Sequence, residues 1–175
     1  MEKYELTEEK INWCGKTLHR IRACKDFVTA SGLQIKAGDL GGYVENECNL
    51  SQYGNAWVCG DAKVCGNAKV YGNAKVCGDT WVCGNAKVYK TSHYLVIGPI
   101  GSRDDFTTFC RDESNQIAVK CGCFNGTIDD FVKKVNETHG DSKYAKVYLK
   151  AVELAKLQID LEEDKENEQT QGLSN

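Results

Sequence analysis

Hydrophobic and polar positions follow a six-residue pattern through the middle of the chain. From Gly54 to Tyr89 the sequence divides into six hexads, GNAWVC, GDAKVC, GNAKVY, GNAKVC, GDTWVC and GNAKVY. A shift of six residues preserves 18 of 30 positions, whereas a shift of eighteen residues preserves 15 of 18. The repeating unit is therefore three hexads, which predicts that each residue stacks on its counterpart eighteen residues later.

Each hexad has a valine two positions after an alanine or threonine, so both side chains lie on one face of a predicted short strand. Branched valine suits a strand, and the small residue suits a tight interior. Glycine followed by Asn or Asp suits the corner between strands. The pattern predicts a mainly β fold class built on a triangular solenoid of 18 residues per coil, with coils about 4.8 Å apart.

The residues beside each valine are expected to point outward, and they differ among the three predicted sides. Tyr71 over Tyr89 marks one side, and the other two sides mix Trp with Lys and carry cysteines. Outward aromatic residues favour contact with a partner. We expect a homotrimer, with the first side as the most uniform candidate interface. The predicted interface residues are Tyr71, Tyr89, Lys69, Lys87, Trp57 and Trp81.

The flanks predict a cap before the repeat and an α/β unit after it. Alternation predicts a strand over 17–23, and Leu50 lies six residues before Ala56, which predicts an imperfect first coil. Three strands are expected in HYLVIG, DFTTFC and NQIAVKC, followed by helices that begin at Thr127 and near Ser142. The predicted domains are an N-terminal β cap (1–45), a β-helix (46–90), an α/β unit of about three strands and two helices (91–161) and a disordered acidic tail (162–175).

Charge and composition narrow the expected partners. The net charge is −3, and residues 160–175 hold six acidic residues and one lysine. The remainder lacks a cluster of excess Lys and Arg, so nucleic acid is not an expected partner. No run of eighteen apolar residues occurs, so we expect no membrane span and a cytoplasmic location.

The ten cysteines of a chain in a reducing compartment are expected to be free thiols. The stacked pairs Cys59 with Cys77 and Cys65 with Cys83 are expected to stay reduced as well. On adjacent parallel strands their side chains point the same way, which makes the disulfide dihedral awkward.

The hexads resemble the left-handed parallel β-helix of hexapeptide-repeat proteins, whose best-known members are trimeric acyltransferases that use acyl-coenzyme A or an acyl carrier protein. Together with TLHRIRACKDF before the repeat and IGPIGSRDDFTTF and CGCFNGTIDDFVKKV after it, the chain more closely resembles small bacteriophage and prophage proteins described as putative transferases or polymer-forming proteins. The resemblance implies a fold more firmly than a chemistry.

Three functions are consistent with this resemblance. The first is a non-catalytic, homotrimeric binding or assembly protein in the host cytosol, with no cofactor. In one version it sequesters a host nucleotide signal or a host defence protein in clefts between subunits. The second is an acyltransferase that uses acyl-coenzyme A. The third is a structural virion or scaffold component.

The residues that would carry catalysis are sparse, which favours the non-enzymatic function. The hexapeptide enzymes use a histidine as general base, and the six hexads contain none. His93 follows them directly and is the candidate base of the acyltransferase alternative. Its other interpretation is a half-buried strand residue without catalytic function.

Two short segments are candidates for binding an anion. Ser102 and Arg103 lie in a glycine-rich turn, which exposes backbone amides beside a guanidinium group. The alternative is a surface turn in which Arg103 pairs with a neighbouring aspartate. Arg20 and Arg22 belong to a second basic segment, whose alternative is a solvated strand face.

A metal site is not expected. Cys121 and Cys123, with Cys110 and His139 as further donors, do not match the paired spacing of structural zinc sites. A buried thiol beside a sheet edge is the alternative interpretation of these cysteines.

Overall fold

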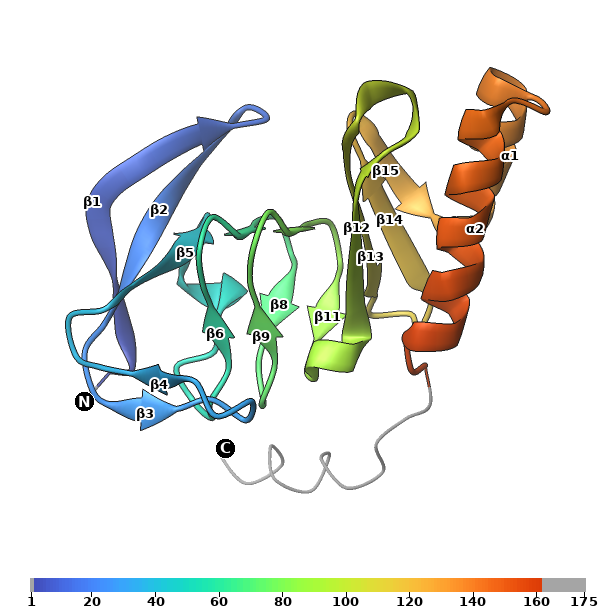
Figure 1. Cartoon of the computed structure of the whole chain (residues 1–175). Helices are drawn as coiled ribbons and strands as arrows, with labels where there is room; N and C mark the ends of the chain where they lie inside the picture. The colour runs from blue at the N-terminus through green and yellow to red at the C-terminus, as the bar shows by residue number, and fades with distance from the viewer. Residues whose placement is uncertain (1, 162–175) are drawn as a thin grey trace.

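The computed structural model describes residues 2–161, and the predicted acidic tail lies outside them. The N-terminal strands form a hairpin, β1 with β2, which continues through β5 into the repeat (Figure 1). The pairing of β2 shifts register between Arg20 and Arg22, which allows Leu18 and Ile21 both to be buried. These strands are β1 (Tyr4–Trp13), β2 (Lys16–Ala23), β3 (Phe27–Val28), β4 (Gln34–Ile35) and β5 (Leu40–Val44).

The hexads form six two-residue strands, each of which ends where the next glycine turn begins. Each strand pairs in parallel with the strand eighteen residues away, as Val58 does with Val76. The three pairs are β6 with β9, β7 with β10 and β8 with β11. Their bounds are β6 (Trp57–Val58), β7 (Lys63–Val64), β8 (Lys69–Val70), β9 (Lys75–Val76), β10 (Trp81–Val82) and β11 (Lys87–Val88).

The predicted fold class, a short left-handed parallel β-helix with caps, is wrong. The described residues form five sheets and two helices, and three of the sheets have only two strands. Most strand pairs are antiparallel, because the long strands all come from the flanks. A Gly-Asn or Gly-Asp turn every six residues limits each repeat strand to two residues, so the parallel pairs contribute little to the sheets compared with the long strands of the flanks.

The side chains inside the repeat are small and fully covered. All six hexad valines have an exposed fraction of 0%, as do the five hexad alanines, and Thr80 has 1%. The valines and alanines form one core with Tyr4, Val44 and Leu50 from the N-terminal flank and Cys110 from the C-terminal flank. The repeat therefore shares its core with both flanks.

Two of the three repeat pairs are covered by other parts of the chain. Trp57 of β6 is 1% exposed, and the ring of Phe27 from the β3–β4 hairpin meets it edge to face at 5.4 Å. Trp81 of β10 meets Trp13 of β1 at 5.5 Å, and the Lys120 ammonium lies 4.0 Å from its ring centroid. The assignment of Trp57 to an oligomer interface is therefore corrected, because the chain's own hairpin buries it.

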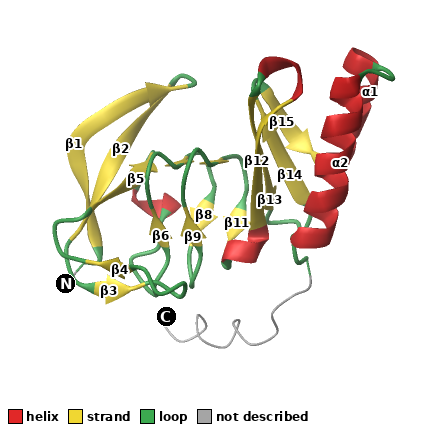
Figure 2. Cartoon of the chain, viewed as in Figure 1, coloured by secondary structure: helices red, strands yellow, loops and turns green. Residues whose placement is uncertain are grey.

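The C-terminal part is a four-stranded antiparallel sheet with both helices on one face (Figures 1 and 2). The three predicted strands and two helices are present, together with a fourth strand, β15, that was not predicted. The elements are β12 (Tyr94–Ile100), β13 (Asp105–Arg111), β14 (Ile117–Cys121), β15 (Phe124–Thr127), α1 (Ile128–His139) and α2 (Lys143–Gln158).

Local interactions explain where this unit's helices begin and what holds them on the sheet. The Thr127 hydroxyl accepts the backbone N–H of Asp130 and caps α1, as the sequence predicts. Phe131 of α1 packs against Phe109 of the sheet and Tyr148 of α2. The other face of the sheet meets the repeat, where the Tyr94 hydroxyl donates to the Lys75 carbonyl.

The two stacked cysteine pairs, which are expected to stay reduced, differ in the structure. The structure joins Cys59 and Cys77 in a disulfide, with their Cα atoms 4.7 Å apart. The eighteen-residue register places the two Cα atoms within the range that a disulfide spans. Cys65 and Cys83 are free, and the Cys65 sulfur accepts the indole N–H of Trp81.

None of the helices within residues 2–161 is both long and apolar enough to cross a membrane.

Burial predicts unequal roles for the two repeat tryptophans. Trp57→Ala should lower the free energy of unfolding by about 3–5 kcal/mol, because it empties a fully enclosed site. Trp81→Ala should cost less, since its ring is half-buried. Chemical denaturation of both variants measures the difference, and equal losses would contradict the cover that Phe27 provides for Trp57.

Candidate functional site

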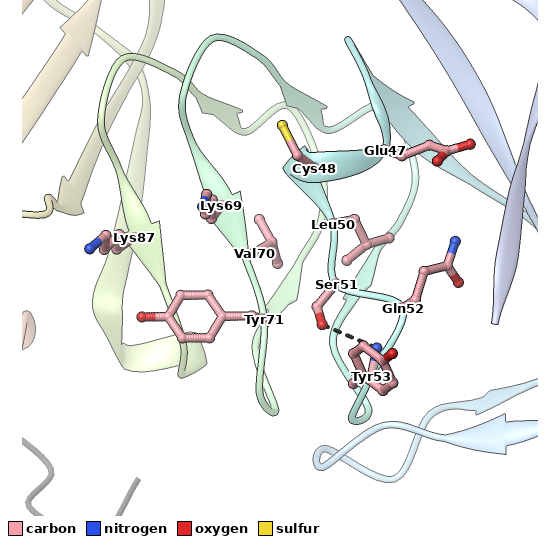
Figure 3. Close-up of a pocket in the computed structure, with 10 residues that line it drawn as sticks. All are labelled: Glu47, Cys48, Leu50, Ser51, Gln52, Tyr53, Lys69, Val70, Tyr71 and Lys87. Carbon is pink, nitrogen blue, oxygen red and sulfur yellow. Dashed lines mark hydrogen bonds between the residues drawn. The ribbon is translucent and has the colours of Figure 1, made fainter. Parts of the chain in front are cut away.

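A surface pocket of about 430 Å³ lies over the third repeat pair, β8 with β11, and the segment that precedes the hexads (Figure 3). This is the pair of strands with tyrosine and lysine side chains. The lining residues are Glu47, Cys48, Leu50, Ser51, Gln52, Tyr53, Lys69, Val70, Tyr71 and Lys87.

A change of register creates the pocket. Leu50 bridges Val70, twenty residues away, and the Ser51 N–H donates to the Val70 carbonyl. The Asn55 N–H then donates to the Gly72 carbonyl, which restores the seventeen-residue step used by the hexads. Two extra residues are therefore accommodated between Ser51 and Asn55. Because of these two residues, the small Ser51 is the neighbour of Tyr71 on one side, whereas Tyr89 is its neighbour on the other. The small side chain of Ser51 leaves a hollow beside Tyr71.

The two extra residues, Gln52 and Tyr53, have different environments. The Gln52 amide oxygen accepts the backbone N–H groups of Lys3 and Tyr4, and its NH₂ group donates to the Tyr4 carbonyl. These bonds fasten the segment to the N-terminal strand. Tyr53 is 85% exposed and lies at the rim of the pocket (Figure 3). Leu50 was predicted to lie in register with Ala56, and this two-residue shift corrects that alignment.

Two lysines lie side by side on one wall. Lys69 and Lys87 are direct partners in the parallel pairing of β8 with β11, so their Cα atoms are about 4.8 Å apart. Within residues 2–161, no carboxylate forms an ion pair with either ammonium group. Glu47 contributes to the lining, but its carboxylate points away from both lysines (Figure 3). The wall is therefore positively charged.

The Tyr71 side chain is held in place by Tyr89. Its ring meets that of Tyr89 edge to face at 5.2 Å, and the Tyr89 ring lies directly against Gly72, where any Cβ would collide with it. Burial raises the pKa of the Tyr71 phenol, and the positive charge of Arg111 opposes part of that rise. Arg111 thus adds a third cation near the same strands.

The upper rim is a capped 3-10 turn, Glu47–Asn49. The Asn46 side chain accepts the Cys48 N–H, and the Asn49 side chain accepts the Asn46 N–H. Asn49 also donates to the carbonyls of Gly66 and Ala68. The turn is therefore fixed to the repeat, and it presents the exposed Cys48 thiol at the pocket edge.

His93, the candidate catalytic base, does not line this pocket. It is 1% exposed and belongs to a 3-10 turn, Thr91–His93, instead of a strand. Its Nδ1 accepts the backbone N–H of Tyr89, so His93 supports the backbone at the end of the last hexad.

The predicted anion-binding residues are not brought together. Arg20 donates to the Tyr43 hydroxyl and lies 3.5 Å from the Glu9 carboxylate, and Arg22 pairs with Glu5. Both arginines are therefore paired with carboxylates of the N-terminal hairpin and do not lie beside Ser102 and Arg103. Ser102 and Arg103 lie in the C-terminal part, in the 3-10 turn between β12 and β13.

The second pair of predicted residues has other neighbours than expected. Arg103 forms no ion pair with Asp104 or Asp105, and its guanidinium lies 4.0 Å from the Cys123 sulfur. The Cys121 sulfur accepts the Thr107 hydroxyl. Residues 2–161 contain no group of three or more His, Cys, Asp or Glu side chains arranged to hold a metal ion.

The predicted interface residues thus divide into two sets. Trp57 and Trp81 contact the chain's own flanks, whereas Tyr71, Lys69 and Lys87 line the pocket and Tyr89 packs against Tyr71. The sequence predicts that these four residues lie in a subunit interface, and it does not predict the pocket. The sequence does contain a signal for the pocket, because the residues SQY interrupt the hexad pattern between Leu50 and the first hexad.

No protein-family model matches the chain, and no curated protein sequence is similar to it. Function is therefore inferred from the pocket.

Burial of Tyr71 predicts a contribution to alkaline unfolding. Its pKa is higher in the folded chain than the ordinary value of 10.0, so its stabilising contribution is complete below pH 10 and is lost as the pH rises further. Tyr71→Phe should therefore lose less stability than the wild type between pH 9 and pH 11. Parallel curves of unfolding free energy against pH would contradict the shift.

Proposed function

We propose that the protein is a non-catalytic binding protein that captures a phosphate-bearing small molecule in the pocket over β8 and β11. The observation that carries this proposal is the Lys69–Lys87 pair, which lies on adjacent strands beside an open pocket and lacks a carboxylate partner in the described part of the chain.

The electrostatics of the pair favour a multivalent anion. Like charges opposite each other on neighbouring strands repel and destabilise the pairing. An anion between the two ammonium groups replaces that repulsion with two attractive contacts. Lysine binds phosphate as a point charge through charge-assisted hydrogen bonds, which suits this arrangement. Arg111 strengthens the positive potential near Tyr71.

The pocket offers binding groups without a recognisable set for catalysis. No histidine lines it, and its one thiol, Cys48, donates to the Asn46 side chain. The acyltransferase alternative requires His93 to reach a substrate, and its 1% exposure disfavours that role. We therefore propose that the protein binds the small molecule without catalysing a reaction.

The cellular setting of the proposal comes from the resemblance to phage proteins. There the protein would act in the host cytoplasm and withhold a small anionic molecule from the host. In one alternative, a homotrimer joined through Tyr71 and Tyr89 would place these residues at a contact between subunits. In the others, a host defence protein or a virion component would bind this surface. These alternatives predict no affinity for a small anion.

Binding of pyrophosphate tests the proposal directly. The full chain should bind pyrophosphate in calorimetry, with an affinity that falls as salt is raised. The double variant Lys69→Gln, Lys87→Gln should bind at least about tenfold more weakly, because it removes both charge-assisted contacts.

The matched control is the double variant Lys63→Gln, Lys75→Gln, which changes the same hexad position on β7 and β9. It should bind like the wild type. Absence of pyrophosphate binding, or equal losses in both double variants, would refute the proposal. Light scattering on the same samples reports whether a trimer is present and whether it depends on Lys69 and Lys87.

A further inference from the structure

The pocket is larger than an inorganic anion requires. Its volume of about 430 Å³ is within the range of sites that enclose whole small molecules. The two lysines occupy one wall only, and the remaining lining includes two aromatic side chains, Tyr71 and Tyr53. A ligand that fills this space has a flat apolar part in addition to its charge.

Tyr71 is suited to receive such a flat part. The edge contact with Tyr89, itself seated on Gly72, restricts the Tyr71 ring before any ligand arrives. In Figure 3 the ring extends from its backbone toward the side of Lys87, away from Ser51 and Tyr53. A ring fixed in advance loses little conformational entropy on binding, which increases the affinity gained by stacking. Aromatic side chains stack on every nucleobase, because each base has a π-face.

The rest of the lining complements a sugar and a second ring contact. The Ser51 hydroxyl accepts the Tyr53 N–H, so its own O–H is available to donate to a ligand oxygen. Tyr53 lies at the rim, where the residue is 85% exposed and its ring has room to approach a ligand. The two-residue insertion that opens the pocket therefore also supplies its second aromatic side chain.

We infer that the ligand is a nucleoside phosphate, with its phosphates at Lys69 and Lys87 and its base against the ring of Tyr71. This assignment rests on the proposed function, because it requires the same lysine pair to bind an anion. It adds that the aromatic residues, and not charge alone, determine which anions are retained.

A comparison of ADP with pyrophosphate separates the base from the phosphates. Both probes carry a diphosphate group, so the lysine contacts are shared. ADP should bind the full chain about tenfold more tightly than pyrophosphate, which is the order of one base–ring stack. Tyr71→Leu should abolish this advantage, so that this variant binds ADP and pyrophosphate with equal affinity, whereas Tyr71→Phe should retain the advantage.

Measurable pyrophosphate binding by Tyr71→Leu also shows that the variant is folded. Tyr144→Leu is the matched control, since Tyr144 is an exposed tyrosine on α2, and it should bind both probes like the wild type. If ADP binds no more tightly than pyrophosphate, or if Tyr71→Leu retains the advantage, this inference is overturned and the proposed function stands. If neither probe binds, both are overturned.

Discussion

The rest of the structure depends on one backbone interaction, the hydrogen bond between residues seventeen positions apart. The N–H groups of Trp57, Cys59 and Lys63 donate to the carbonyls of Ala74, Val76 and Thr80, and the same step continues to the last hexad. These bonds satisfy the backbone of strands that are only two residues long. They also bring the valines and alanines of successive hexads together, and so create the core on which both flanks pack.

The same register determines what lies outside the core. Equal side chains become neighbours, which is favourable for valine and costly for lysine. Lys69 beside Lys87 is therefore a local electrostatic cost imposed by the repeat. Where the register slips by two residues, between Ser51 and Asn55, an open space forms next to this charged pair. Charge and space coincide there because one rule of pairing holds on β8 and β11 and is broken in the preceding segment.

The sequence predicts the buried side chains well and the cover over them poorly. Period-two spacing is sufficient to place the hexad valines inside, because burial follows from local alternation. The burial of Trp57 depends on Phe27, which lies thirty residues earlier in the chain. Phe27 belongs to a two-residue strand that no local sequence pattern predicts. The fold class failed for a related reason, since the long antiparallel strands of the flanks dominate the sheets. To predict the pocket, the sequence has to be aligned with Gln52 and Tyr53 treated as an insertion.

The difference among the three repeat pairs now has a physical interpretation. A pair that carries tryptophan offers a large apolar ring, and in both cases another segment of the chain covers that ring, Phe27 over Trp57 and Trp13 against Trp81. The third pair offers tyrosine with two lysines, a combination that costs more to cover because both charges would lose water. Leaving this pair open avoids that cost within the chain. An anionic ligand can bind there because it brings the compensating charge that the chain's own segments lack.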